Sequence, residues 1–192
     1  MIETIISNNC AGGAIMHELG MEFKSPTINL QILPEQYWRF CEDFWIYMHQ
    51  DLKEIRQQDL DQWQQVWLRK MFGGIPDMPY GMLSDILVCF QHYESFDQAK
   101  AKWDERAAKI DYHNIGFIMH ARGKEYDVEA AAFAAAKIPH KLLLTEGFDL
   151  PGSIRFDGGG FDAVNGKLRI TQVYDFKRWR ETDGQDQDPC NV

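Results

Sequence analysis

The sequence predicts an α/β fold with a mainly parallel, in part mixed, central sheet and helices on both faces, in a Rossmann-like layered architecture. Nearly continuous apolar runs, typical of strands buried on both faces, occur at residues 4–6, 85–93, 114–120 and 140–145. Segments with helical spacing of apolar residues separate these runs. Because strands that alternate with helices usually pair in parallel, the pattern favours a parallel sheet.

Apolar spacing and helix-start signals place the connecting helices. Pro34 suits the first position of a helix, and Ser95 with Gln98 resembles a capping box. The expected helices cover residues 11–19, 34–48, 60–71, 96–109 and 128–138. Beyond them, a triple glycine at 158–160 predicts a flexible turn and residues 167–173 predict a short strand.

Length, charge and cysteine usage bound the class of protein. The 192 residues predict one domain over 1–180 and an acidic, disordered tail over 181–192. A net charge of −9 without a basic cluster argues against nucleic acid as a partner. The absence of a long apolar run or signal peptide predicts a cytoplasmic protein with no membrane insertion. Four scattered cysteines predict free thiols, and neither a metal nor a cofactor is expected.

The turn after the first strand is the first candidate site. A strand-to-helix turn directs backbone N–H groups and the positive end of the helix dipole towards one point, which suits an anion or a thiolate. Glycines at its helix start either pack the helix against its strand or let a ligand approach the backbone. Cys10 is either a buried thiol or a nucleophile. The candidate ligand-binding residues of this turn are Ser7, Asn8, Asn9, Gly12 and Gly13.

Other candidates follow from the expected parallel sheet, in which ligands bind at the carboxyl ends of the strands. His92 and Tyr93 end the run at 85–93 and should emerge on the same rim as Cys10, as should Arg122 after the next strand. Pro26 makes the segment 23–30 extended, beside the first turn, and adds Ser25, Thr27 and Asn29 to the ligand-binding candidates.

Two further features have both a structural and a functional interpretation. Arg106 shares a helix face with Trp103, so it needs either a structural carboxylate or an anionic ligand. Trp63 and Trp67 lie on a more exposed helix, where they either cover an edge of the core or form a surface for a protein partner.

An ordered set of motifs over roughly the first 122 residues resembles a bacterial family, domain-of-unknown-function family 1919, usually labelled exopolysaccharide biosynthesis protein. The motifs are Ile5–Cys10, Gly12–Gly13, Leu19–Gly20, Phe23, Ser25–Leu30, Asp85–Ile86, His92–Tyr93, Ala99, Lys102–Trp103, Arg106 and Asn114. The resemblance implies a role in surface-polysaccharide biosynthesis and brings no established reaction. The segment 57–75 looks longer here, and His120 to Gly123 lacks the acidic residue that the family tends to carry before its arginine.

More distantly, Ser7 to Cys10 before a helix, with His92–Tyr93, is similar to putative papain-like cysteine peptidases. That similarity implies a Cys10 thiolate, lowered in pKa by the helix dipole and by His92. The antiparallel sheet of papain-like folds conflicts with the parallel sheet predicted here. We therefore expect a transferase or hydrolase that acts on a saccharide, nucleotide-sugar or acyl substrate, with an anionic ligand in the cleft. The alternative is a non-catalytic binding or scaffold protein of the same pathway.

Overall fold

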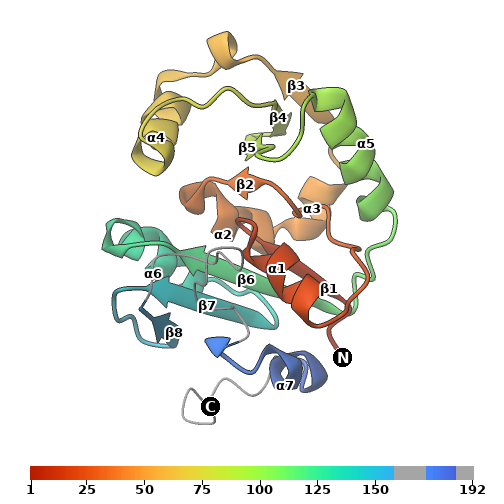
Figure 1. Cartoon of the computed structure of the whole chain (residues 1–192), viewed down its shortest axis with the longest axis vertical. Helices are drawn as coiled ribbons and strands as arrows, with labels where there is room; N and C mark the ends of the chain where they lie inside the picture. Colours follow the sequence, from red (N-terminus) through yellow and green to blue (C-terminus); the bar gives the residue numbers. More distant parts are fainter. Residues whose placement is uncertain (158–171, 185–192) are drawn as a thin grey trace.

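The computed structural model describes residues 1–157 and 172–184, and its described strands form two four-stranded sheets (Figure 1). The first sheet has the order β1-β6-β7-β8, and all its strands are parallel. Its members are β1 (Thr4–Ser7), β6 (Ile115–Ala121), β7 (Lys141–Glu146) and β8 (Ser153–Phe156). The α/β class and the parallel pairing predicted for three of the apolar runs are therefore confirmed.

Helices cover both faces of the parallel sheet, as predicted. On one face, α1 (Ala11–Glu18) and α7 (Phe176–Glu181) pack through Ile15, Phe176 and Trp179. On the other, α2 (Pro34–Glu42) and α6 (Asp127–Ala135) pack through Tyr37 and Phe133, whose rings stack at 5.7 Å. These apolar layers fix the ends of β1, β6 and β7 relative to one another.

The second sheet is antiparallel and corrects the prediction for residues 85–93. It has the order β2-β5-β4-β3 and comprises β2 (Gln31–Ile32), β3 (Leu52–Ile55), β4 (Tyr80–Leu83) and β5 (Ile86–Cys89). Leu83 pairs with Ile86, and Ser84 between them has a positive φ of 59°. A two-residue hairpin joins only antiparallel strands, so β5 cannot enter the parallel sheet in the predicted way.

Helices α4 (Gln62–Phe72) and α5 (Phe96–Ala107) flank this second sheet (Figure 1). The predicted helix at 34–48 is interrupted at Asp43, where α3 (Phe44–Met48) begins. The N–H of Ile32 donates to the carbonyl of Asn8 at 2.9 Å, so the second sheet adjoins the end of β1.

The C-terminal part of the chain differs in part from expectation. Glu181 belongs to α7 rather than to a disordered tail, and Trp179 of this helix is fully buried. The triple glycine at 158–160, nearly all of the strand expected at 167–173, and residues 185–192 lie outside the described residues.

Candidate functional site

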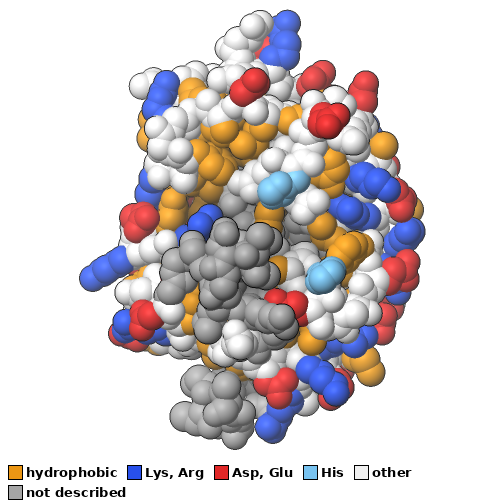
Figure 2. Space-filling view, in the orientation of Figure 1, with side chains coloured by type: hydrophobic (Ala, Val, Ile, Leu, Met, Phe, Trp, Pro, Cys, Tyr) orange, Lys and Arg blue, Asp and Glu red, His pale blue; other side chains and the backbone are white. Residues whose placement is uncertain are grey.

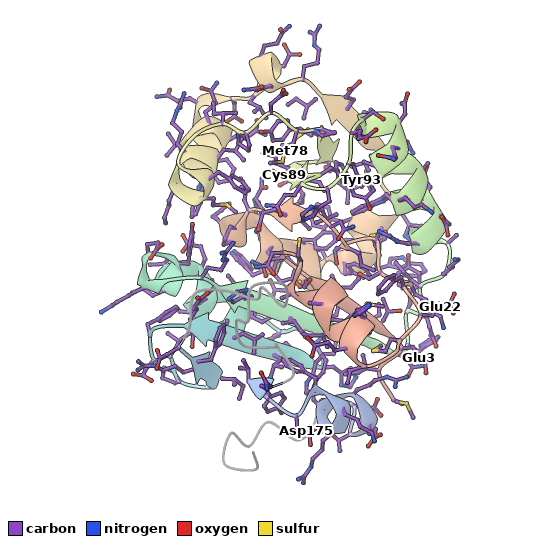
Figure 3. All side chains as sticks on the ribbon, in the orientation of Figure 1. Glu3, Glu22, Met78, Cys89, Tyr93 and Asp175 are labelled. Carbon is purple, nitrogen blue, oxygen red and sulfur yellow. The ribbon has the colours of Figure 1, made fainter. Side chains whose placement is uncertain are left out.

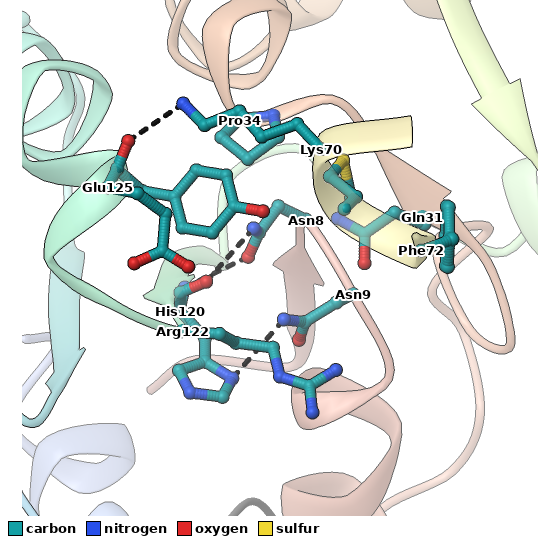
Figure 4. Close-up of a pocket in the computed structure, with 11 residues that line it drawn as sticks. Asn8, Asn9, Gln31, Pro34, Lys70, Phe72, His120, Arg122 and Glu125 are labelled. Carbon is teal, nitrogen blue, oxygen red and sulfur yellow. Dashed lines mark hydrogen bonds between the residues drawn. The ribbon is translucent and has the colours of Figure 1, made fainter. Parts of the chain in front are cut away.

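A cavity with two adjoining compartments lies at the carboxyl ends of β1 and β6, and Figure 4 draws the polar one. The polar compartment encloses about 230 Å³ and is bounded on its far side by Lys70, Met71 and Phe72 of α4. The thiol compartment encloses about 180 Å³ and contains Cys10 and Gln91. Both compartments share four lining residues: Asn9, Gln31, His120 and Arg122. The cavity therefore lies between the parallel sheet and elements of the second layer.

Side chains of the first turn satisfy the N–H groups at the start of α1. The Asn9 side-chain oxygen accepts from the Ala11 N–H at 3.0 Å, and the Ser7 hydroxyl oxygen accepts from the Gly12 N–H at 3.0 Å. These N–H groups are two of the donors that the sequence predicts to bind an anion. With these two groups already paired inside the protein, an anion in the cavity depends mainly on side-chain cations.

Asn8 ties the end of β1 to β6. Its side-chain oxygen accepts from the backbone N–H of His120 at 2.9 Å, and its amide nitrogen donates to the His120 carbonyl at 3.2 Å (Figure 4). Asn8 is only 1% exposed, so both hydrogen bonds are buried. These two hydrogen bonds extend the contact between β1 and β6 by one residue beyond Ser7 and fix the position of the His120 backbone.

The hydrogen bonds around His120 assign the proton of its imidazole. The Asn9 oxygen is taken by the Ala11 N–H, so the Asn9 amide nitrogen faces His120 Nδ1, at 3.2 Å, as a donor. His120 Nδ1 must then accept. In the neutral ring the proton is on Nε2, which lies 3.3 Å from a carboxylate oxygen of Glu146. His120 Nδ1, on the side of Asn9, is therefore a hydrogen-bond acceptor, and Nε2 carries the proton and faces the Glu146 carboxylate.

Burial lowers the pKa of His120 below its usual value, while the Glu146 carboxylate opposes part of that shift and the Arg122 charge adds to it. The imidazole is therefore neutral at neutral pH. A neutral imidazole whose acceptor nitrogen borders a cavity has the protonation state of a general base.

The lowered pKa of His120 predicts a pH dependence of stability. Between the folded pKa and the unfolded value of about 6.5, the unfolded chain binds more protons, so the free energy of unfolding rises with pH there. We expect the contribution of His120 to be complete above about pH 6.5 and to be lost as the pH falls towards the folded pKa. Urea unfolding of wild type and His120→Gln from pH 5 to 8 measures it. Equal pH slopes in the two proteins would contradict the buried neutral imidazole.

Two cations reach the polar compartment. Arg122 is exposed and lines both compartments, and its charge lowers the pKa values of Cys10, His120 and Tyr126. Lys70 of α4 donates to the Glu125 carbonyl at 2.8 Å and lies 4.4 Å from the Trp67 ring centre. Figure 4 shows the Arg122 guanidinium beside the His120 ring and the Lys70 amine at the opposite side of the compartment.

The structure gives Cys10 a different neighbour from the predicted one. Gln91 Oε1 lies 3.6 Å from the thiol, whereas His92 is exposed and lines neither compartment. Burial also raises the pKa of Cys10, and the Arg122 charge only partly opposes that shift. The expected lowering of the Cys10 pKa by the helix dipole and His92 is therefore wrong. The reason is that β5 enters the second sheet and directs Gln91 towards the turn.

Several predicted ligand-binding residues support the turn instead of lining the cavity. Thr27 Oγ1 accepts from the Ser7 N–H at 3.1 Å and lies 2.9 Å from the Ser25 hydroxyl, which places the segment 23–30 beside the first turn as predicted. Asn29 is exposed with a φ of 64°. Asn8, Asn9 and Arg122 are the ligand-binding candidates that line the cavity, together with Cys10.

Tyr93 and Arg106 form a contact of their own, away from the cavity. The Arg106 guanidinium donates to the Tyr93 hydroxyl at 2.9 Å, and Tyr93 donates to the Ile28 carbonyl at 3.3 Å. Figure 3 places Tyr93 between β5 and α5. Thus Arg106 is held by neutral oxygen atoms rather than by the structural carboxylate or ligand anion that the sequence suggested.

The sequence did not indicate His120, Glu146, Gln91, Gln31 or Lys70 as site residues. His120 and Glu146 did carry a signal. Each follows an apolar run at the carboxyl end of a parallel strand, where ligands bind. Lys70 carried none, because only the packing of α4 brings it to the cavity.

The predicted partner surface on α4 is in part exposed. Trp63 is 39% and Val66 56% exposed, and hydrophobic side chains gather over α4 and the second sheet in Figure 2. Trp67 instead packs against Tyr126 at 6.4 Å between ring centres. Within residues 1–157 and 172–184, no helix has the length and apolar character that crossing a membrane requires.

Comparison with known proteins adds two findings. A family model described as domain of unknown function (DUF1919) matches residues 2–148. A Haemophilus influenzae protein, described as uncharacterized, is 24% identical over 176 residues, which span 92% of this chain and 76% of the relative. The matched range includes the cavity residues from Asn8 to Tyr126 and also Glu146.

Proposed function

The chain belongs to the family of domain of unknown function 1919, and from that premise we propose that it is a transferase or hydrolase of surface-polysaccharide biosynthesis whose substrate is an anionic saccharide. One observation carries the proposal: the neutral His120 imidazole borders both compartments, with Glu146 behind it and Arg122 beside it. The sequence resemblance supplies the pathway and a cytoplasmic location, and the chemistry of the cavity supplies the substrate class.

His120 is the general base in this proposal, and His92, which is exposed and lines neither compartment, takes no part. His120 Nδ1 removes the proton of an acceptor hydroxyl that replaces the Asn9 amide, while that oxygen attacks the electrophilic centre of the donor. Glu146 stabilises the imidazolium that forms, and the departing group later takes the proton. A sugar hydroxyl as acceptor makes the enzyme a transferase, and water makes it a hydrolase.

Arg122 and Lys70 supply the attraction for a phosphate or carboxylate. The polar compartment is too small for a large ligand and suits one charged sugar unit or the charged part of a nucleotide-sugar. The thiol compartment, with Cys10 and two alanines, receives the less polar part of the substrate.

Calorimetric titration with glucuronate, glucose 1-phosphate, UDP-glucose and neutral glucose tests the proposal. We expect an anionic sugar to bind in preference to glucose, and Arg122→Gln to weaken it about 10- to 100-fold, since a hydrogen bond to a charged group contributes about 1.5–3 kcal/mol. Arg155→Gln, an exposed arginine on β8, is the matched control. Equal affinity for glucose and the anionic sugars, or an unaffected Arg122→Gln, would contradict the proposal.

The catalytic step has its own readout. Turnover of the sugar that binds, followed by NMR, should be lost in His120→Gln and strongly reduced in Glu146→Gln, which keeps the shape of the side chain. If both variants fold and turn over at the wild-type rate, His120 is not the base.

A binding or scaffold protein is the second candidate, favoured by the exposed Trp63 and Val66 on α4. If this candidate is correct, NMR should show no chemical conversion of any sugar by the protein. Trp63→Ser should weaken binding to another protein of the pathway without altering the cavity.

A further inference from the structure

A second cavity opens at the amino ends of β6 and β7, at the opposite end of these strands from the first cavity. It encloses about 410 Å³, more than either compartment of the first cavity. Its lining includes Ile115, the first residue of β6, and Pro139 and His140 just before β7. His120 and Glu146 lie at the other ends of the same strands. Since β6 has seven residues and a strand rises about 3.3 Å per residue, the two cavities are about 20 Å apart.

The inner surface of this cavity is apolar. Cys41, Phe44, Ile115 and Phe117 are all buried, and the Phe44 and Phe117 rings meet edge to face at 5.4 Å between centres. A rigid apolar floor of this kind, with a volume within the usual range for small-ligand sites, is typical of a preformed binding pocket.

Trp45 forms an aromatic wall at the cavity entrance. Its side chain is 59% exposed, although a tryptophan usually buries most of its surface. The Tyr112 ring lies 4.7 Å away at 70°, and the His49 ring lies 4.2 Å away. His49 Nδ1 also hydrogen-bonds with the Trp45 carbonyl at 2.7 Å, so the wall is held by neighbours on its own helix and across the cavity.

Polar groups stand around the apolar floor. Glu42 accepts the Lys137 N–H through one carboxylate oxygen at 2.9 Å, which fixes the carboxyl group and leaves its second oxygen as an acceptor for a ligand hydroxyl. His113 adds an exposed imidazole. Among the described residues, the Tyr112 hydroxyl has no hydrogen-bond partner.

We propose that this cavity binds a neutral pyranose unit of a saccharide chain. A pyranose ring has an apolar C–H face that stacks on an aromatic ring and a rim of hydroxyl groups, and the cavity offers Trp45 with Tyr112 for the face and Glu42 with His113 for the rim. Glu42 repels an anionic sugar, and no lysine or arginine from the described part of the chain lines this cavity. In the polar compartment, by contrast, Lys70 and Arg122 outnumber Glu125, so the two sites differ in preference. The proposal stands independently of the chemistry at His120.

Saturation-transfer-difference NMR with cellobiose, maltose and N,N′-diacetylchitobiose tests the proposal. We expect at least one of these neutral disaccharides to receive saturation on the C–H protons of one ring face. Trp45→Ala should abolish the transfer and Trp45→Phe should retain part of it. Trp63→Ala, a matched exposed tryptophan on α4, and Arg122→Gln should both behave as wild type.

Four outcomes would overturn the proposal. The first three are absence of transfer to all three disaccharides, transfer that persists in Trp45→Ala, and transfer that persists undiminished in Glu42→Arg, which replaces the carboxylate acceptor at the rim. The fourth is loss of binding in Arg122→Gln, which would assign the saccharide to the first cavity instead.

Discussion

Gly12→Ala should lower the free energy of unfolding by about 1–3 kcal/mol, the usual cost of overpacking a well-filled core. A Cβ atom at Gly12 would lie 2.4 Å from Ser7 Oγ and 2.9 Å from Ser7 Cβ, so the buried serine would have to move. Ser7 Oγ accepts the Gly12 N–H and donates to the Asn9 carbonyl at 2.5 Å. Moving it would also disturb the turn that positions Asn9. Urea denaturation measures the loss.

Gly13→Ala is the matched control for this substitution. A Cβ atom there would meet the Ile28 side chain at 3.3 Å, a contact that a small shift relieves. Alanine is also favoured over glycine in a helix by up to about 1 kcal/mol, which offsets the cost of the shift. We expect Gly13→Ala to stay close to wild type. Equal losses at both positions would show that the glycines act through helix flexibility rather than through packing against Ser7.

Asn8→Ala should cost about 2–6 kcal/mol, because it leaves the buried N–H and carbonyl groups of His120 without partners and each such group costs about 1–3 kcal/mol. Thermal and urea unfolding should both show the loss. Asn114→Ala removes one hydrogen bond, to the Asp111 carboxylate at 2.7 Å, from a half-buried site and should cost clearly less, because water can replace the lost donor there. If the two alanine variants were equally stable, Asn8 would not act as a clamp between β1 and β6.

The sequence patterns were sufficient for the parallel sheet because β1, β6 and β7 are continuous apolar runs separated by helices. They failed at β5. Its run is equally apolar, but pairing with β4 depends on a hairpin through Ser84 and Asp85, which lacks the usual Asn-Gly or Asp-Gly signal. β4 was not predicted, because Pro76, Pro79 and Gly81 in and before it are typical of a loop.

Part of the candidate site could be predicted, because several of its residues directly follow strands of the parallel sheet. Asn8, Asn9, Cys10 and Arg122 follow strand ends, and the structure brings them to one cavity. The position of Lys70 depends on Trp67 packing against Tyr126, a contact between distant segments that no local pattern encodes. The path of a short loop after β5 brings Gln91, and not the predicted His92, next to Cys10.

The double hydrogen bond between Asn8 and the His120 backbone has a consequence for how this family can diversify. Asn8 serves the sheet and the cavity at once, so a substitution there that altered ligand preference would also reduce stability. Lys70, on the exposed side of α4, carries no comparable structural cost. A change in ligand preference can therefore arise on the second layer while the turn after β1 stays unchanged, which separates the evolution of specificity from that of the scaffold.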